Sequence, residues 1–89
     1  MQTVVQEEIR EFLLVTLAGP MNVSLDIDTV TDDSPLGAEG IDLESLTLIE
    51  LTLHIQQEFG IDVPDADIER IGAMTLGELV AYVARRGTT

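Results

Sequence analysis

The hydroxyl of Ser45 is the side-chain group in this 89-residue sequence that is best placed for chemical modification. It falls in the first turn of a predicted helix, where unpaired backbone N–H groups and the helix dipole favour a phosphate. Serine is also common at helix starts, so the position alone is most simply that of a structural serine. Three neighbouring features distinguish Ser45 from Ser24 and Ser34: an apolar stripe beside it, a carboxylate before it and an irregular segment leading up to it.

Other kinds of site chemistry find little support in the sequence. There is no cysteine, which excludes disulfides, thiolate nucleophiles and zinc–thiolate sites. The only histidine, His54, lies about half a turn around the helix from Ser45, which excludes a serine–histidine catalytic pair, and we expect it on the surface. The aspartates of residues 26–33 lack calcium-loop spacing, because Val30 and Thr31 stand where a ligand and a glycine belong. We therefore expect neither catalytic residues nor a metal site.

Composition narrows the function classes further. Seventeen acidic residues against four basic ones give a formal net charge of −13, which disfavours nucleic-acid and membrane partners and favours basic proteins. A hydrophobic content of 45% excludes a disordered acidic tail, and no apolar run is long enough for a membrane span or a signal peptide. We expect residues 1–89 to form a single monomeric cytoplasmic domain. The start at Met1 and the polar end indicate a free-standing protein.

Helical periodicity organises most of the chain. It predicts three longer helices and one short one, over about residues 5–18, 43–59, 64–72 and 76–86. Gly60 is expected to end the second helix in the left-handed conformation, and Thr75 with Glu78 has the form of a capping box. Residues 20–41 show no period and predict a long ordered loop, held to the core by Val23, Leu25, Ile27, Val30 and Leu36. The predicted fold is an all-α compact bundle.

The second helix carries two apolar stripes. The first is a core stripe made of Leu48, Leu51, Thr52, Ile55 and Phe59. The second stripe consists of Leu46, Ile49 and Leu53, lies on the same side as Ser45 and is flanked by Glu50 and Gln57. Two interpretations are open: a thin protein buries its central helix on two sides, or the second stripe is an exposed docking surface with a rim of carboxylates.

Two runs of the sequence resemble an acyl carrier protein. They are residues 44–51 (ESLTLIEL), with an acidic residue before Ser-Leu and a following Glu-Leu, and residues 58–65 (EFGIDVPD), with Glu-Phe-Gly and a hydrophobic-x-hydrophobic-Pro turn. The resemblance extends through Ile71 to the last helix with Tyr82 and covers about residues 3–86. The Ser-Leu motif alone is weak, whereas the serial match is specific.

The resemblance implies a carrier rather than an enzyme. Ser45 would hold 4′-phosphopantetheine, transferred from coenzyme A by a phosphopantetheinyl transferase, and its thiol would carry acyl groups as thioesters. Acyl-loading, condensing and acyl-transfer enzymes with basic docking patches would be the other partners. The recognition surface would comprise Glu44, Leu46, Ile49, Glu50, Leu53 and Gln57. An acyl pocket would be lined by Leu51, Ile55, Phe59, Val63, Ile68 and Ile71.

The sequence departs from the family pattern before Ser45 and along the second helix. Glu44 replaces the usual Asp, and Thr47, Gln56 and Gln57 stand where carriers of fatty acid synthesis tend to have carboxylates. These neutral positions favour a discrete carrier of a polyketide or other specialised pathway over one of housekeeping fatty acid synthesis.

Three alternatives remain open. A peptidyl or aminoacyl carrier shares the fold and the serine, although a charge of −13 argues against it. An unmodified acidic DNA mimic would bind basic nucleic-acid enzymes but leaves the second stripe without a purpose. A helical hub for peptides would need a Met-rich surface, and only Met21 and Met74 are internal.

Overall fold

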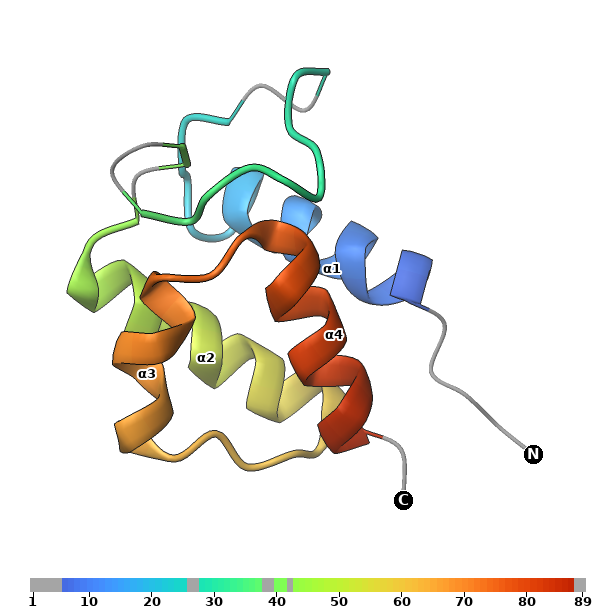
Figure 1. Ribbon diagram of the computed structural model, residues 1–89, viewed down its shortest axis with the longest axis vertical. Helices are drawn as coiled ribbons and strands as arrows, with labels where there is room; N and C mark the ends of the chain where they lie inside the picture. The colour runs from blue at the N-terminus through green and yellow to red at the C-terminus, as the bar shows by residue number, and fades with distance from the viewer. Residues whose placement is uncertain (1–5, 26–27, 38–39, 42, 88–89) are drawn as a thin grey trace.

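The computed structural model describes residues 6–25, 28–37, 40–41 and 43–87 and contains four helices (Figure 1). Their bounds are Gln6–Ala18 (α1), Ser45–Phe59 (α2), Asp65–Gly72 (α3) and Leu76–Gly87 (α4). Among these described residues the only strand-like feature is an isolated bridge between Pro35 and Thr75. The predicted all-α bundle, with a long connection between its first two helices, is confirmed; the predicted positions Val5, Asp26 and Ile27 lie outside the described residues.

A single aliphatic core joins the helices. α1 packs against α2 and α4, and α2 packs against α3. The fully buried side chains follow helical spacing on each element, as predicted: Ile9, Leu13 and Leu17 on α1, Leu51, Thr52 and Ile55 on α2, Ile71 on α3, and Leu76, Leu79, Val80 and Val83 on α4. At one edge of this core Phe12 and Phe59, both half-buried, meet edge to face with ring centroids 5.2 Å apart.

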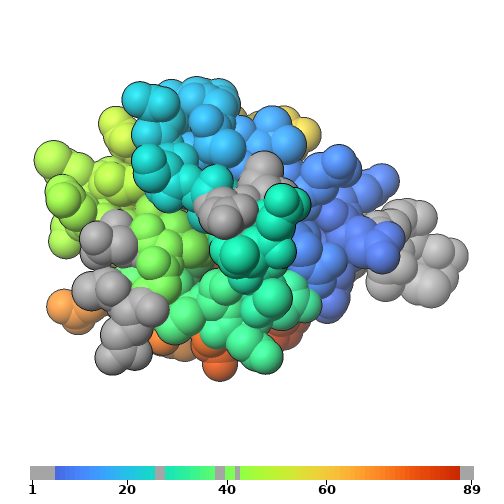
Figure 2. Space-filling model, turned by 90° about the horizontal axis from the view of Figure 1, so that it is seen from above, coloured from blue at the N-terminus to red at the C-terminus, as the bar shows by residue number. Residues whose placement is uncertain are grey.

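The connection between α1 and α2 is anchored by Leu36, which is fully buried. Its N–H donates to the carbonyl of Met74 over 2.9 Å, and its own carbonyl accepts the N–H of Leu43 over 2.8 Å. Val23, Leu25 and Val30 are half-buried against the core, as the sequence predicted. Figure 2 shows this connection spread over one face of the molecule, beside α1. The described parts of this connection are therefore held in place by contacts with the core and with the segment before α4.

The same connection supplies hydrogen-bond acceptors to the start of α4. The N–H groups of Leu76 and Gly77, in the first turn, donate to the carbonyls of Ser34 and Asp32 over 2.9 and 2.8 Å. A Cβ at Gly77 would lie 2.8 Å from the Cβ of Asp32, so this approach requires glycine. Arg10 of α1 donates two hydrogen bonds, of 2.7 and 2.8 Å, to the Asp32 carboxylate and so links α1 to the same segment.

Two of the predicted helix caps are present. The Thr75 N–H donates to Glu78 Oε1 over 2.9 Å, and the Glu78 N–H donates to Thr75 Oγ1 over 3.2 Å, which is a reciprocal capping box. Gly60 ends α2 at φ 66°, and its N–H donates to the Gln56 carbonyl. These local motifs were readable from residue types and spacing alone.

The start of α2 differs from the sequence prediction. The helix begins at Ser45 rather than at about Leu43, because the Leu43 N–H is already bonded to Leu36 and Glu44 is extended at φ −82° and ψ 168°. Glu44 is the N-cap but makes no side-chain capping hydrogen bond. The pairing with Leu36 thus makes Ser45 the first helical residue.

A polar cluster links α3 to α4. Asp67, on the inner face of α3, accepts hydrogen bonds from Tyr82 Oη at 2.7 Å and from Arg86 at 3.1 Å, and Arg70 lies 3.3 Å away. Arg86 also stacks over the Tyr82 ring at 4.9 Å and donates to the Asp62 carbonyl. Tyr82 is buried, and its hydroxyl is satisfied by the hydrogen bond to Asp67. Arg86 therefore links the end of α4 to α3 and to the segment before it.

Replacing Asp67 by alanine should lower the free energy of unfolding by about 2–4 kcal/mol, because a buried tyrosine hydroxyl and Arg86 lose their acceptor. Urea denaturation followed by circular dichroism measures this loss. Asp65→Ala is the matched control, since Asp65 is exposed on the same helix, and its expected effect is below about 1 kcal/mol. Equal effects of the two substitutions would contradict a role for the Asp67 cluster in holding α3.

Alkaline pH should destabilise the protein through Tyr82. Burial, together with the hydrogen bond to Asp67, raises the pKa of the Tyr82 phenol above its ordinary value. Its contribution to stability is therefore complete below that ordinary value and is lost as pH rises through the folded-state pKa. The sequence has one tyrosine and no cysteine, and its four basic residues are all arginines, so tyrosinate absorbance reports this group alone. Tyr82→Phe should flatten the fall in Tm at alkaline pH, and an unchanged fall would contradict the assignment.

Candidate functional site

Ser45 presents its hydroxyl to solvent as the first residue of α2. The first N–H groups of a helix have no intrahelical partner, and no side chain of Glu44 occupies them here. The next N–H, that of Leu48, is bonded to the Glu44 carbonyl over 2.8 Å. An exposed hydroxyl beside unpaired N–H groups suits a covalently attached phosphate, and attachment at Ser45 stays a prediction.

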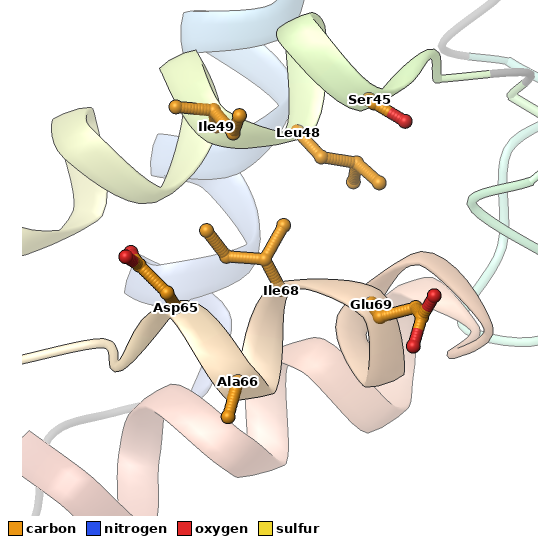
Figure 3. A pocket seen from close by; sticks show the side chains of 7 residues that line it. All are labelled: Ser45, Leu48, Ile49, Asp65, Ala66, Ile68 and Glu69. Carbon is orange, nitrogen blue, oxygen red and sulfur yellow. The ribbon is translucent and has the colours of Figure 1, made fainter.

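A groove of about 670 Å³ runs from Ser45 between α2 and α3 (Figure 3). It is lined by Ser45, Leu48, Ile49, Asp65, Ala66, Ile68 and Glu69. In Figure 3 Leu48 and Ile68 point toward each other from the two helices, whereas Asp65 and Glu69 carry carboxylates at the edge formed by α3. The groove is therefore apolar inside and acidic at its rim.

The second stripe faces solvent. Leu46, Ile49 and Leu53 are 75%, 40% and 51% exposed, so burial of the central helix on two sides is wrong. Glu44, Glu50 and Gln57 are exposed as well. Because isolated exposed apolar residues are common but an apolar stripe with acidic flanks is not, this surface is suited to docking a partner with complementary apolar and basic groups.

The predicted acyl-pocket residues are divided between core and groove. Leu51, Ile55 and Ile71 are fully buried and Val63 is buried, whereas Phe59 and Ile68 are half-buried. Only Ile68 of the six lines the groove. Their role in holding an acyl chain stays a prediction.

Several groove residues have no site role in the prediction from sequence. Leu48 was placed in the core stripe alone, and Asp65, Ala66 and Glu69 were not singled out. The spacing of these residues does predict a shared face. Ile68 and Glu69 follow Asp65 by three and four positions, which places all three on one side of a helix.

His54 is half-buried on α2. With Leu53 and the residues Pro20 and Met21 it lines a smaller hollow of about 390 Å³, away from the groove that starts at Ser45. Within the described parts of the chain, no group of three or more histidine or acidic side chains is placed to hold a metal ion. None of the helices in those parts has the length and apolarity needed to cross a membrane.

Known proteins are similar to this chain in amino-acid sequence. The family model described as "Phosphopantetheine attachment site" matches residues 6–83. The chain belongs to the acyl carrier protein family. It is 33% identical over 64 residues to an acyl carrier protein of Thermotoga maritima, covering 72% of this chain and 75% of the relative. Acyl carrier proteins of Lactobacillus acidophilus (32% over 62 residues, 70% and 74% covered) and Rhodococcus erythropolis (31% over 71, 80% and 67%) are also similar.

Membership of this family defines the chemistry of this carrier. An acyl carrier protein is not a catalyst and holds a covalently attached 4′-phosphopantetheine group, which a phosphopantetheinyl transferase adds and acyl-handling enzymes then use. The residues present fit such a group, because an exposed serine hydroxyl lies at the start of α2 beside unpaired N–H groups and opens onto the groove.

Proposed function

We propose that Ser45 is the phosphopantetheine attachment point and that this chain is a cytoplasmic, single-domain carrier for a polyketide or other specialised pathway. The observation that carries the proposal is the exposed Ser45 hydroxyl at the start of α2, next to the exposed second stripe. The attached group supplies a thiol that bears acyl groups as thioesters. The α2 N–H groups offer donors to its phosphate, and no acid or base from this chain is required.

Partner docking is proposed to use the face that surrounds Ser45. Leu46, Ile49 and Leu53 offer apolar area, and the carboxylates of Glu44 and Glu50 attract basic patches on partner enzymes. Because the chain has a formal net charge of −13, this attraction speeds the encounter with a basic partner and weakens as salt rises. A carrier that visits several enzymes benefits from this fast and reversible contact.

Intact-mass spectrometry tests the attachment. We expect the purified protein, incubated with coenzyme A and a promiscuous phosphopantetheinyl transferase, to gain the mass of one prosthetic arm, and proteolysis to locate the arm on the peptide that contains Ser45. An unchanged mass would overturn the proposal. It would favour an unmodified acidic protein that binds basic nucleic-acid enzymes.

The proposal of a specialised pathway starts from three neutral residues of α2, Thr47, Gln56 and Gln57, which stand where carriers of fatty acid synthesis tend to have carboxylates. Gln56 has a structural role, because its Oε1 accepts the Val63 N–H over 3.0 Å. The lack of a carboxylate at position 56 is therefore not part of the argument about partner enzymes. Thr47 and Gln57 remain as positions on or near the surface where a carboxylate is absent. They reduce the acidity of the face that partner enzymes meet.

Carboxylates at these two positions should improve recognition by enzymes of fatty acid synthesis. We expect Thr47→Glu with Gln57→Glu to lower the KM of a fatty-acid malonyl transferase for the holo-carrier several-fold at low salt, with kcat little changed. Gln56→Glu is the matched control and should have little effect, because that side chain is turned to Val63. A wild-type KM already as low as that of a fatty-acid-synthesis carrier would contradict the pathway assignment.

A further inference from the structure

The hollow of about 390 Å³ beside His54 lies between α2 and the corner that follows α1, residues 19–23. It has an apolar and a polar part, formed by Pro20, Met21 and Leu53 and by Glu50, His54 and Gln57 respectively. Because Leu53, Glu50 and Gln57 also belong to the proposed docking face, the hollow extends that face from α2 onto the corner.

The corner is held by its own backbone hydrogen bonds. The Met21 N–H donates to the Thr16 carbonyl over 3.1 Å. The Val23 N–H donates to the Leu17 carbonyl over 2.7 Å. Between them Asn22 takes the left-handed conformation at φ 55°, which asparagine adopts more readily than most residues. The Met21 wall of the hollow is therefore preformed, which lowers the entropy cost of binding a side chain against it.

The polar part of the hollow is acidic. Glu50 is exposed, and among the described residues no ion pair or side-chain hydrogen bond involves its carboxylate. No arginine lines the hollow, and the sequence contains no lysine. An apolar wall beside a carboxylate suits a long side chain that has an aliphatic stem and a cationic end.

We propose that this hollow binds one arginine side chain of a partner enzyme. The aliphatic stem lies against Met21 and Leu53, and the guanidinium pairs with Glu50 beside the imidazole of His54. Arginine fits better than lysine, because its planar guanidinium is more weakly hydrated, pairs with a carboxylate through two N–H groups and stacks on flat rings. The inference rests on the proposed function, since the arginine is one of the basic groups with which partner enzymes meet the carrier.

Methyl NMR with blocked amino acids tests the hollow without any partner enzyme. The sequence contains three methionines, so methyl-labelled methionine gives three signals, of which Met21 reports on the hollow and Met74, which does not line it, is the internal control. At about 0.15 M salt we expect N-acetyl-arginine methylamide to shift the Met21 signal saturably and to leave Met74 unchanged. The citrulline analogue has nearly the same shape without the charge and should bind about three- to fivefold more weakly. The lysine analogue should also bind more weakly than the arginine analogue.

Two variants of equal net charge separate Glu50 from the general attraction of an acidic protein. Glu50→Gln should weaken binding of the arginine analogue about three- to fivefold. The matched control Glu58→Gln removes the same charge from an exposed position of α2 outside the hollow and should leave binding unchanged. His54→Lys should abolish binding, because a second cation then stands in the wall of the hollow.

Met21→Ala tests the apolar wall. It should weaken binding of the arginine and lysine analogues alike, since both stems lose the same contact, with the Leu53 methyl signals as the readout.

Three results would overturn the inference. The first is a Met21 signal that does not respond to the arginine analogue. The second is an equal loss of binding in Glu50→Gln and Glu58→Gln, which would assign the binding to overall charge alone. The third is a citrulline analogue that binds as tightly as the arginine analogue. None of these results depends on modification of Ser45, so failure of this inference and failure of the proposed attachment site are distinguishable.

Discussion

Ser45→Ala should abolish phosphopantetheine attachment completely while leaving the fold intact. Ser45 is exposed and heads α2, and the polar contacts that hold the ends of this helix involve other residues. Alanine has a helix propensity at least equal to that of serine, so the free energy of unfolding should change by less than about 0.5 kcal/mol. Intact mass after incubation with coenzyme A and a transferase should show no gain, and the far-UV circular dichroism spectrum should match that of the wild type.

The matched control is Ser24→Ala. Ser24 is exposed in the connection between α1 and α2 and should keep the full mass gain. Ser34 is a poorer control, because its Oγ accepts the N–H of Thr31 over 2.9 Å and its loss would perturb the connection. A mass gain retained in the Ser45→Ala protein would move the attachment to another hydroxyl and remove the basis of the proposed function.

Leu51→Asp and Leu53→Asp should have opposite outcomes although they are two residues apart on α2. Leu51 is fully buried, so aspartate there forfeits about 2–3 kcal/mol of apolar burial and adds a larger cost for an unpaired charge in the core. A domain of this size is stable by about 5–10 kcal/mol, and we expect the variant to be unfolded at 25 °C. Leu53 is 51% exposed, and aspartate there should cost less than about 1 kcal/mol.

The effect of Leu53→Asp should appear in partner recognition. Losing apolar area at the centre of a docking surface reduces binding by about tenfold or more, so transferase kcat/KM for this variant should fall by that factor. Circular dichroism and transferase kinetics on the same samples separate the two effects. Unfolding of Leu53→Asp would contradict the exposure of the second stripe, and unchanged kinetics would remove the second stripe from the transferase-docking surface.

Local motifs were predictable because they depend on residues close in sequence. The capping box of Thr75 and Glu78 and the left-handed Gly60 each involve residues within one turn of a helix. The same holds for the core stripe of α2, whose spacing alone separates Leu51 from Leu53. Ser45 as a helix-start serine followed from the same periodicity, although its position as the first helical residue required the pairing of Leu43 with Leu36.

Contacts between distant residues were decided only by the tertiary structure. Asp67 reaches Tyr82 and Arg86 over 15 and 19 positions, and Asp32 meets Arg10 and the start of α4. No period encodes such pairings, because they depend on how helices cross rather than on which residues share a face.

The sequence by itself determined the helices, two of their caps and the presence of a second apolar stripe beside Ser45, whereas the tertiary structure decided that this stripe is exposed and that Ser45 is the first helical residue. The packing of α3 against α2 decided the groove and the place of Leu48 within it. Periodicity assigns a residue such as Leu48 to a buried face, but whether that face meets the core, a groove or both depends on how closely the next helix approaches. A Cβ on Gly72 at the end of α3 would lie 2.8 Å from Leu48 Cδ1, so a larger residue there would require Leu48 to shift.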